Sequence, residues 1–267
     1  MITDLGEIKV TPLAGPRDWE GYPPGYEKHP ARNHPAFTRA VLAALRDPRD
    51  IVSLLWDPQA GVGTTLIEGL RLGYNPIGWD IDERWRALWR GLDRIREIER
   101  PYPGRVQVIV SSPAYDRTNK ARGQGAKQEA NQASIGSVAG CEWGEFPPGH
   151  LGGAEDVIEW VLLARQVLER CFEALMPEGK IGWIVRDRIH RGRPAGFVDL
   201  NANLLQRHGF ELIGGYWRRL VPTANEQMRV KLEEGRVDHD QGLLLTAPPR
   251  PRPTIDREWA LIARKPP

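Results

Sequence analysis

Three groups of residues in this 267-residue chain have the types and the spacing to do chemistry. The first is a glycine turn, Asp57-Pro58-Gln59-Ala60-Gly61-Val62-Gly63-Thr64-Thr65, between an apolar run and a helix-like stretch. The second is Asp80, 17 residues beyond Gly63, and the third is Ser111-Ser112-Pro113-Ala114-Tyr115, which follows another apolar run. They offer a turn that a ligand can approach closely, an acid for a ribose, and a segment that can hold a flat, amine-bearing ring.

The glycine turn differs from two common nucleotide-binding motifs. It lacks the third glycine of the dinucleotide fingerprint, and it lacks the Gly-Lys-Ser/Thr ending of a P-loop. Asp80 nevertheless lies close to the spacing of about 20 residues at which an acid binds a ribose in dinucleotide folds. The turn therefore predicts a ligand that is neither a pyrophosphate nor a nucleoside triphosphate, and the alternative is an ordinary strand-to-helix turn.

Residues 57–65 resemble the DPFxGxGTT motif of S-adenosylmethionine-dependent DNA amino-methyltransferases, and Ser112-Pro113-Ala114-Tyr115 resembles their (Ser/Asn/Asp)-Pro-Pro-Tyr motif. His29-Pro30-Ala31-Arg32, with Pro35 after it, resembles the HPA-containing segment that precedes the cofactor motif in many members. The order of the three segments matches one of the circularly permuted arrangements of the family. Ala114 departs from the pattern, because the family has a second proline there, whose rigid φ helps to aim the aromatic ring.

This resemblance implies an α/β, Rossmann-like methyltransferase fold, with a mostly parallel twisted sheet and helices on both faces. It implies S-adenosyl-L-methionine as cofactor and direct methyl transfer to an exocyclic amine, for which no metal is required. The Ser112 hydroxyl and the Pro113 carbonyl would accept the amine hydrogens while Tyr115 stacks on the extruded base. The cofactor-binding residues that it implies are His29, Pro30, Asp57, Pro58, Ala60, Gly61, Gly63, Thr64, Thr65, Asp80 and Ser111.

Hydrophobic periodicity predicts the elements that position these residues. The expected strands are 51–56, 75–79, 106–110, 180–185, 210–217 and 259–263, and the expected helices are 35–45, 64–72, 82–98, 154–176 and 197–208. The tryptophans of helix 82–98 are expected in the core. The family's third strand normally lies between that helix and strand 106–110, and we expect it to be reduced or absent. Asp82, Glu83 and a nearby apolar residue therefore remain alternatives for contacting the cofactor adenine.

Length and composition predict one domain, 1–267, with candidate substrate-recognition insertions at 116–153 and 221–254, which have no regular pattern. The two cysteines have no metal-ligand spacing, so we expect neither a zinc site nor a disulfide framework. No apolar stretch approaches the ~20 residues of a membrane span, and the first ten residues do not resemble a secretion signal. The expected location is the cytoplasm.

The charged residues favour a nucleic-acid partner. The net charge is only +2, but the chain has 30 arginines against 7 lysines, and the arginine fork suits phosphates and guanine edges. Codon bias would give the same ratio of arginine to lysine, and the arginines that are close together in the sequence could instead lie in solvated basic loops. The predicted nucleic-acid-binding residues are Arg117, Lys120, Arg122, Arg188, Arg191 and Arg218.

Ser112 favours one of the possible substrates that the resemblance implies. A serine at the head of the tetrapeptide resembles the cytosine-N4 members, whereas Asp or Asn is commoner among the adenine-N6 members. We therefore expect a DNA cytosine-N4 methyltransferase. The alternatives are an adenine-N6 DNA methyltransferase, an RNA amino-methyltransferase and an inactive nucleic-acid-binding protein with the same fold. The target sequence, a restriction partner and a homo-oligomer remain open.

Overall fold

One sheet organises the molecule. The structure is a computed structural model that describes residues 2–10, 21–26, 33–48, 53–114, 147–187, 189–190, 193–220 and 257–267, without the side chains of 189, 190, 193 and 194. The strands of the main sheet are β1 (Asp4–Glu7), β2 (Leu54–Asp57), β3 (Asn75–Gly78), β4 (Arg96–Glu97), β5 (Val106–Ser111), β6 (Leu175–Arg186), β9 (Glu211–Arg219) and β10 (Arg257–Arg264). The helices are α1 (Pro35–Leu45), α2 (Thr64–Arg71), α3 (Glu83–Trp89), α5 (Val157–Ala174) and α6 (Phe197–Arg207).

The strand order identifies where a ligand would bind. The eight strands follow the order β1–β9–β10–β6–β5–β2–β3–β4, and the strands from β4 to β6 are parallel. That part repeats the 3-2-1-4-5 order of a doubly wound sheet, while β10 lies antiparallel between β6 and β9. The chain turns one way after β2 and the other way after β5, so these neighbours form the topological switch point. The Rossmann-like α/β fold expected from the sequence is confirmed.

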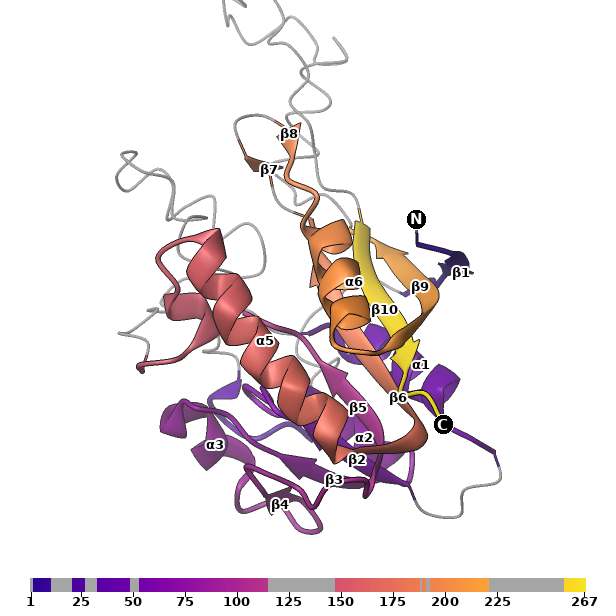
Figure 1. The fold of residues 1–267 in the computed structure, drawn as a ribbon. Helices are drawn as coiled ribbons and strands as arrows, with labels where there is room; N and C mark the ends of the chain where they lie inside the picture. The colour runs from indigo at the N-terminus through magenta and orange to yellow at the C-terminus, as the bar shows by residue number, and fades with distance from the viewer. Residues whose placement is uncertain are drawn as a thin grey trace, which may run out of the picture.

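Helices cover both faces of the sheet because the strands are apolar on both sides. On one face, Leu55, Val108 and Val110 pack with α1 in one buried cluster. On the other face, Trp56 and Ile109 pack with α5 and α6, and Figure 1 shows α5 crossing that face in front of the strands. None of the described helices is long and apolar enough to span a bilayer.

The β4 edge corrects one expectation and supports another. The helix predicted over 82–98 ends at Trp89, and Arg94 adopts a left-handed φ of 67°, which a continuing helix does not permit. The chain then forms the two-residue β4 beside β3, so the third strand is present in reduced form. Glu97 of β4 pairs with Arg86 and Arg90, and these ion pairs hold the short strand against α3.

A buried carboxylate fixes the amino-terminal segment beside the sheet. Glu68 of α2 is fully buried and accepts hydrogen bonds from Tyr22 Oη (2.8 Å), Arg39 Nε (2.5 Å) and Arg71 Nη1 (2.7 Å). Because its three donors come from segment 21–26, α1 and α2, one charge joins three parts of the chain. A methyl group added at Gly25 would lie 3.3 Å from Leu88 of α3, so this segment also reaches α3.

Candidate functional site

The glycine turn, residues 57–65, connects the carboxyl end of β2 to α2. Trp79 N–H donates to the Asp57 carbonyl and Ala60 N–H donates to the Trp79 carbonyl, both at 2.9 Å, so the turn is bonded to the end of β3. Gly63 is the N-cap of α2 and has a left-handed φ of 84°. The first backbone N–H groups of α2 therefore face the switch point, where the helix dipole favours negative or electron-rich groups.

Asp80 braces the turn from the end of β3. Its Oδ2 accepts the Gly61 N–H at 2.8 Å, and its Oδ1 accepts the Asp82 N–H at 2.9 Å. Each carboxylate oxygen has a second lone pair, so the group can still accept a hydroxyl from a ligand. Burial raises the pKa of Asp80 to about 6, against the opposing effect of these two backbone hydrogen bonds. Asp80 thus both shapes the turn and remains able to bind a ligand.

Asp57 lies behind the turn and connects it to β5. Its Oδ1 accepts the Gln59 N–H at 3.0 Å, and the Ser111 hydroxyl at the end of β5 donates to Gln59 Oε1 at 3.5 Å. Burial raises the pKa of Asp57 to about 7 and the charge of Asp80 adds to this, whereas the Gln59 N–H and the nearby hydroxyls of Thr65 and Ser111 lower it. The two predicted acids therefore lie close enough to influence each other's ionisation.

Trp89 is a residue of the site that the sequence did not indicate. Its indole Nε1–H donates to the Gly61 carbonyl at 2.9 Å, and the side chain is fully buried. A methyl group added at Gly63 would lie 2.8 Å from Trp89 Cδ1. The space beside Gly63, which the sequence suggested was kept free for a ligand, is therefore filled by Trp89, and Gly63 is required for packing.

The tetrapeptide, Ser112–Tyr115, begins at the same edge of the sheet, directly after β5. Ser111 is fully buried, Pro113 is buried, and Ser112 and Ala114 are partly exposed. The Ala114 carbonyl accepts a 2.7 Å hydrogen bond from Trp160 Nε1 of α5. Because β2 and β5 are adjacent parallel strands, the tetrapeptide and the glycine turn extend from neighbouring carboxyl ends.

Residues 147–153 approach the segment that follows β3, at Ile81 and Asp82. His150 Nδ1 accepts the Gly152 N–H at 2.9 Å and caps the short helical turn Leu151–Gly153. A methyl group added at Gly149 would lie 3.6 Å from Cδ1 of Ile81, whose side chain is exposed beside Asp80. The end of the insertion predicted at 116–153 therefore lies beside Ile81, while its Leu151 packs in the core.

The pH dependence of folding stability should reveal His150. Burial lowers its pKa to about 4; the charge of Asp82 opposes this shift, and the charge of Arg84 adds to it. Because the folded pKa of His150 lies below its unfolded value, titration of His150 increases the stability of the fold as pH rises from about 4 to 6.5. Asp57 and Asp80 have raised folded pKa values, so their titration decreases the stability as pH rises from about 4 to 7. His150→Asn keeps an acceptor for Gly152 and removes the titration. We expect its free energy of unfolding to fall about 2–3 kcal/mol further than the wild type's over this range in urea titrations, and parallel profiles would contradict the expectation.

Several predicted site residues lie outside the described part of the chain. These are His29, Pro30, Tyr115, Arg117, Lys120, Arg122, Arg188 and Arg191. Arg218 is described, and its Nε donates to Glu258 Oε2 at 2.6 Å while its side chain is 15% exposed. Most of that guanidinium is therefore engaged within the sheet rather than presented to a partner. Among the described residues, no group of three His, Cys, Asp or Glu side chains could hold a metal ion.

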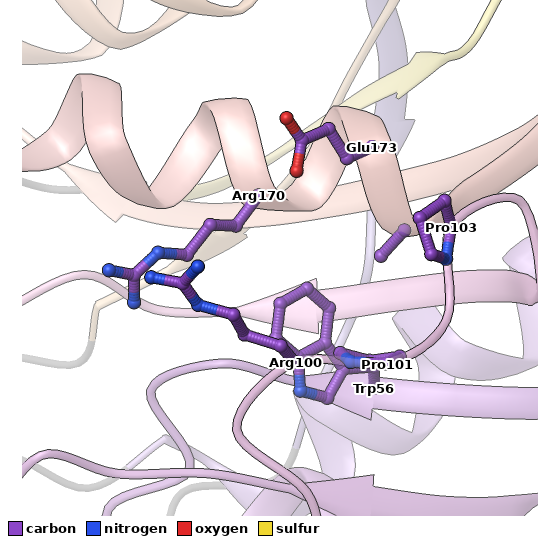
Figure 2. A pocket seen from close by; sticks show the side chains of 7 residues that line it. Trp56, Arg100, Pro101, Pro103, Arg170 and Glu173 are labelled. Atoms are coloured by element: carbon purple, nitrogen blue, oxygen red, sulfur yellow. The ribbon is translucent and has the colours of Figure 1, made fainter.

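A small pocket lies away from this site. Figure 2 shows it between the carboxyl end of α5, represented by Arg170 and Glu173, and the loop that enters β5, represented by Arg100 and Pro103. This is the amino-terminal end of β5, opposite to the switch-point edge. Its volume is about 30 Å³, enough for a water molecule, and Trp56, whose buried Nε1–H has no partner among the described residues, lines it. The pocket is too small for a nucleoside.

No protein-family profile and no curated protein matches this chain. Solved structures resemble it at low identity. The 1,6-didemethyltoxoflavin-N1-methyltransferase of Burkholderia thailandensis, with bound S-adenosylhomocysteine, is 16% identical, with 86% of this chain and 77% of that chain covered and a TM-score of 0.43. A TehB-like SAM-dependent methyltransferase of Corynebacterium glutamicum is 14% identical, with 85% and 87% covered and a TM-score of 0.43. At these values the likeness gives no information on substrate.

Proposed function

We propose that this protein transfers a methyl group from S-adenosyl-L-methionine to an exocyclic amine of a DNA base, with cytosine N4 as the acceptor. One observation supports this above all. The glycine turn with its two buried acids and the tetrapeptide extend from the adjacent ends of β2 and β5, at the switch point where doubly wound sheets bind ligands. A cofactor held by the first would lie beside an amine held by the second.

The described residues fit such a cofactor. Asp80 keeps unused acceptor capacity that suits ribose hydroxyls, and the buried Thr64 hydroxyl at the start of α2 has no hydrogen-bond partner among the described residues. Ile81, exposed beside Asp80, offers an apolar contact for the adenine ring. When bound, S-adenosyl-L-methionine supplies an activated methyl group on a positively charged sulfur. The chain therefore has only to bind and orient the two reactants.

The tetrapeptide would prepare the amine. An exocyclic amine on an aromatic ring is a poor nucleophile because its lone pair is delocalised into the ring. In the proposed mechanism the Ser112 hydroxyl and the Pro113 carbonyl accept the two amine hydrogens, which directs the lone pair towards the methyl group. Tyr115, outside the described residues, would stack on the extruded base. The proton released by the amine leaves to solvent after transfer.

A basic hairpin supports a nucleic-acid substrate. Strands β7 (Ile189–His190) and β8 (Arg193–Pro194) pair antiparallel and project beyond the carboxyl end of β6 (Figure 1). Asp187 closes the base of this hairpin, since its carboxylate accepts the N–H groups of Gly196 (3.2 Å) and Phe197 (2.9 Å). The sequence of residues 186–193 contains four arginines, and a two-stranded ribbon of this kind fits a nucleic-acid groove. Arg218 is not part of this proposed surface.

Nucleoside mass spectrometry tests the proposal. The protein would be incubated with isotopically labelled cofactor and with duplex DNA, single-stranded DNA and RNA in parallel, and each product digested to nucleosides. We expect labelled N4-methylcytosine in DNA from the wild type. Ser112→Ala should reduce turnover at least tenfold and leave cofactor affinity within about twofold, because its contact forms with the amine. Labelled N6-methyladenine alone would show that adenine N6, and not cytosine N4, is the acceptor. Label in RNA alone would show that RNA is the substrate. Cofactor binding without any transfer would contradict the proposal.

A further inference from the structure

Trp160 contacts the tetrapeptide from α5. It lies in α5, 46 residues along the chain from Ala114, and its side chain is fully buried. Its indole Nε1–H donates to the Ala114 carbonyl at 2.7 Å. That carbonyl belongs to the peptide bond that leads into residue 115, so the bond fixes the chain where the tetrapeptide leaves the sheet.

The indole of Trp160 is itself held in place. Its ring packs on Phe197, with centroids 4.7 Å apart. The Phe197 N–H donates to Asp187, and the Phe197 carbonyl accepts the Asn201 Nδ2–H at 2.8 Å. Asn201 in turn accepts the indole N–H of Trp183 in β6 at 2.8 Å. Ring packing joins Trp160 of α5 to this buried hydrogen-bonded group of α6 and β6, so Trp160 has little freedom to move away from Ala114.

Alanine at position 114 makes that contact necessary. A proline ring would restrict φ at this residue, whereas alanine leaves the backbone free to adopt several conformations. We propose that Trp160 is a positioning residue, whose hydrogen bond to the Ala114 carbonyl holds the tetrapeptide in the conformation that presents Ser112 and Pro113 to the amine. The expected effect on turnover rests on the proposed function, whereas the anchoring of Ala114 by Trp160 rests on the described contacts.

A second tryptophan gives a matched control for this proposal. Trp89 is equally buried and donates the same indole hydrogen to a backbone carbonyl, that of Gly61, at 2.9 Å. The two tryptophans therefore form the same bond at the two halves of the site, one in the glycine turn and one in the tetrapeptide. Trp160→Phe and Trp89→Phe remove the same donor and keep an aromatic ring, so loss of stability alone would affect both variants alike.

The test measures turnover, cofactor affinity and backbone hydrogen exchange in both variants. For Trp160→Phe we expect kcat to fall about tenfold or more with the cofactor Kd within about twofold, and exchange to quicken in a peptide covering Val106–Ala114. For Trp89→Phe we expect the cofactor Kd to weaken and exchange in that peptide to stay unchanged. Ala114→Pro added to Trp160→Phe should restore both protection and kcat, because the ring then restricts φ without the hydrogen bond.

The exchange measurement separates this inference from the proposed function. Faster exchange in Trp160→Phe together with an inactive wild type would support the anchoring and contradict the methyl transfer. Unchanged exchange and unchanged kcat in Trp160→Phe would overturn the positioning role. The role would also be overturned if kcat and cofactor affinity fell together, or if Ala114→Pro restored neither readout, since Trp160 would then be a core residue only.

Discussion

Gly63→Ala is expected to lower the free energy of unfolding by about 2–5 kcal/mol and to weaken S-adenosyl-L-methionine binding by more than tenfold. The left-handed φ of 84° costs an alanine about 1–2 kcal/mol, and the added methyl group would lie 2.8 Å from Trp89 Cδ1. Trp89 cannot withdraw without breaking its hydrogen bond to the Gly61 carbonyl. Urea unfolding and titration calorimetry would measure the two effects.

Gly196→Ala separates the cost of strain from the cost of the clash. Gly196 is also the N-cap of a helix, α6, and has a φ of 69°, but a methyl group there would meet no atom within 4 Å. This variant should lose about 1–2 kcal/mol and bind the cofactor normally. Equal losses of stability in the two variants would show that Trp89 accommodates the added methyl group.

Asp80→Asn is expected to weaken cofactor binding at least tenfold and to destabilise the fold by about 1–3 kcal/mol. Each oxygen of Asp80 accepts a different backbone N–H, from Gly61 and from Asp82. An asparagine has one acceptor and one donor, so either orientation of its amide places an NH₂ group against a backbone N–H. The loss of cofactor affinity should therefore exceed that expected from losing one hydrogen bond to the ligand.

Asp57→Asn tests whether the contact between an amide NH₂ group and a backbone N–H causes the loss expected in Asp80→Asn. Asp57 accepts one backbone N–H, from Gln59, and its other polar neighbours are the hydroxyls of Thr65 and Ser111, which can accept from an amide as well as donate. An asparagine can satisfy that arrangement, so we expect a loss below about 1 kcal/mol by urea unfolding. If Asp57→Asn proved as damaging as Asp80→Asn, loss of a buried negative charge would be the common reason.

Local signals predicted the parts of the site that lie close together in the sequence. Helix α1 has the predicted bounds Pro35–Leu45, because a proline at its start and apolar residues at helical spacing specify both its ends and its buried face. The glycine turn and Asp80 lie at adjacent strand ends because alternating strands and helices of this length form a parallel sheet. The order of these elements was sufficient to place the acids and the tetrapeptide at one edge.

Contacts between distant residues could not be predicted in the same way. The apolar spacing from Trp85 to Ile95 fits a helix, but the ion pairs of Glu97 with Arg86 and Arg90 stabilise a short strand instead. Strand β1 is four residues long and exists because it pairs with β9, more than 200 residues further on. The hydrogen bonds of Trp89 and Trp160 likewise depend on tertiary packing, and neither tryptophan has a local sequence signal that separates it from other core residues.

The position of β10 has a consequence for the order of events during synthesis. Because β10 lies between β6 and β9, neither β9 nor its neighbour β1 can join the sheet until residues 257–264 are available. About 250 residues separate β1 from β10, so at about 5–20 residues per second β1 waits roughly 10 to 50 seconds for its place. Until then β6, with Ile181, Trp183 and Val185, is an unpaired apolar edge. We therefore expect the edge of β6 to be open to pairing with other chains late in synthesis, after the proposed cofactor site has already been translated.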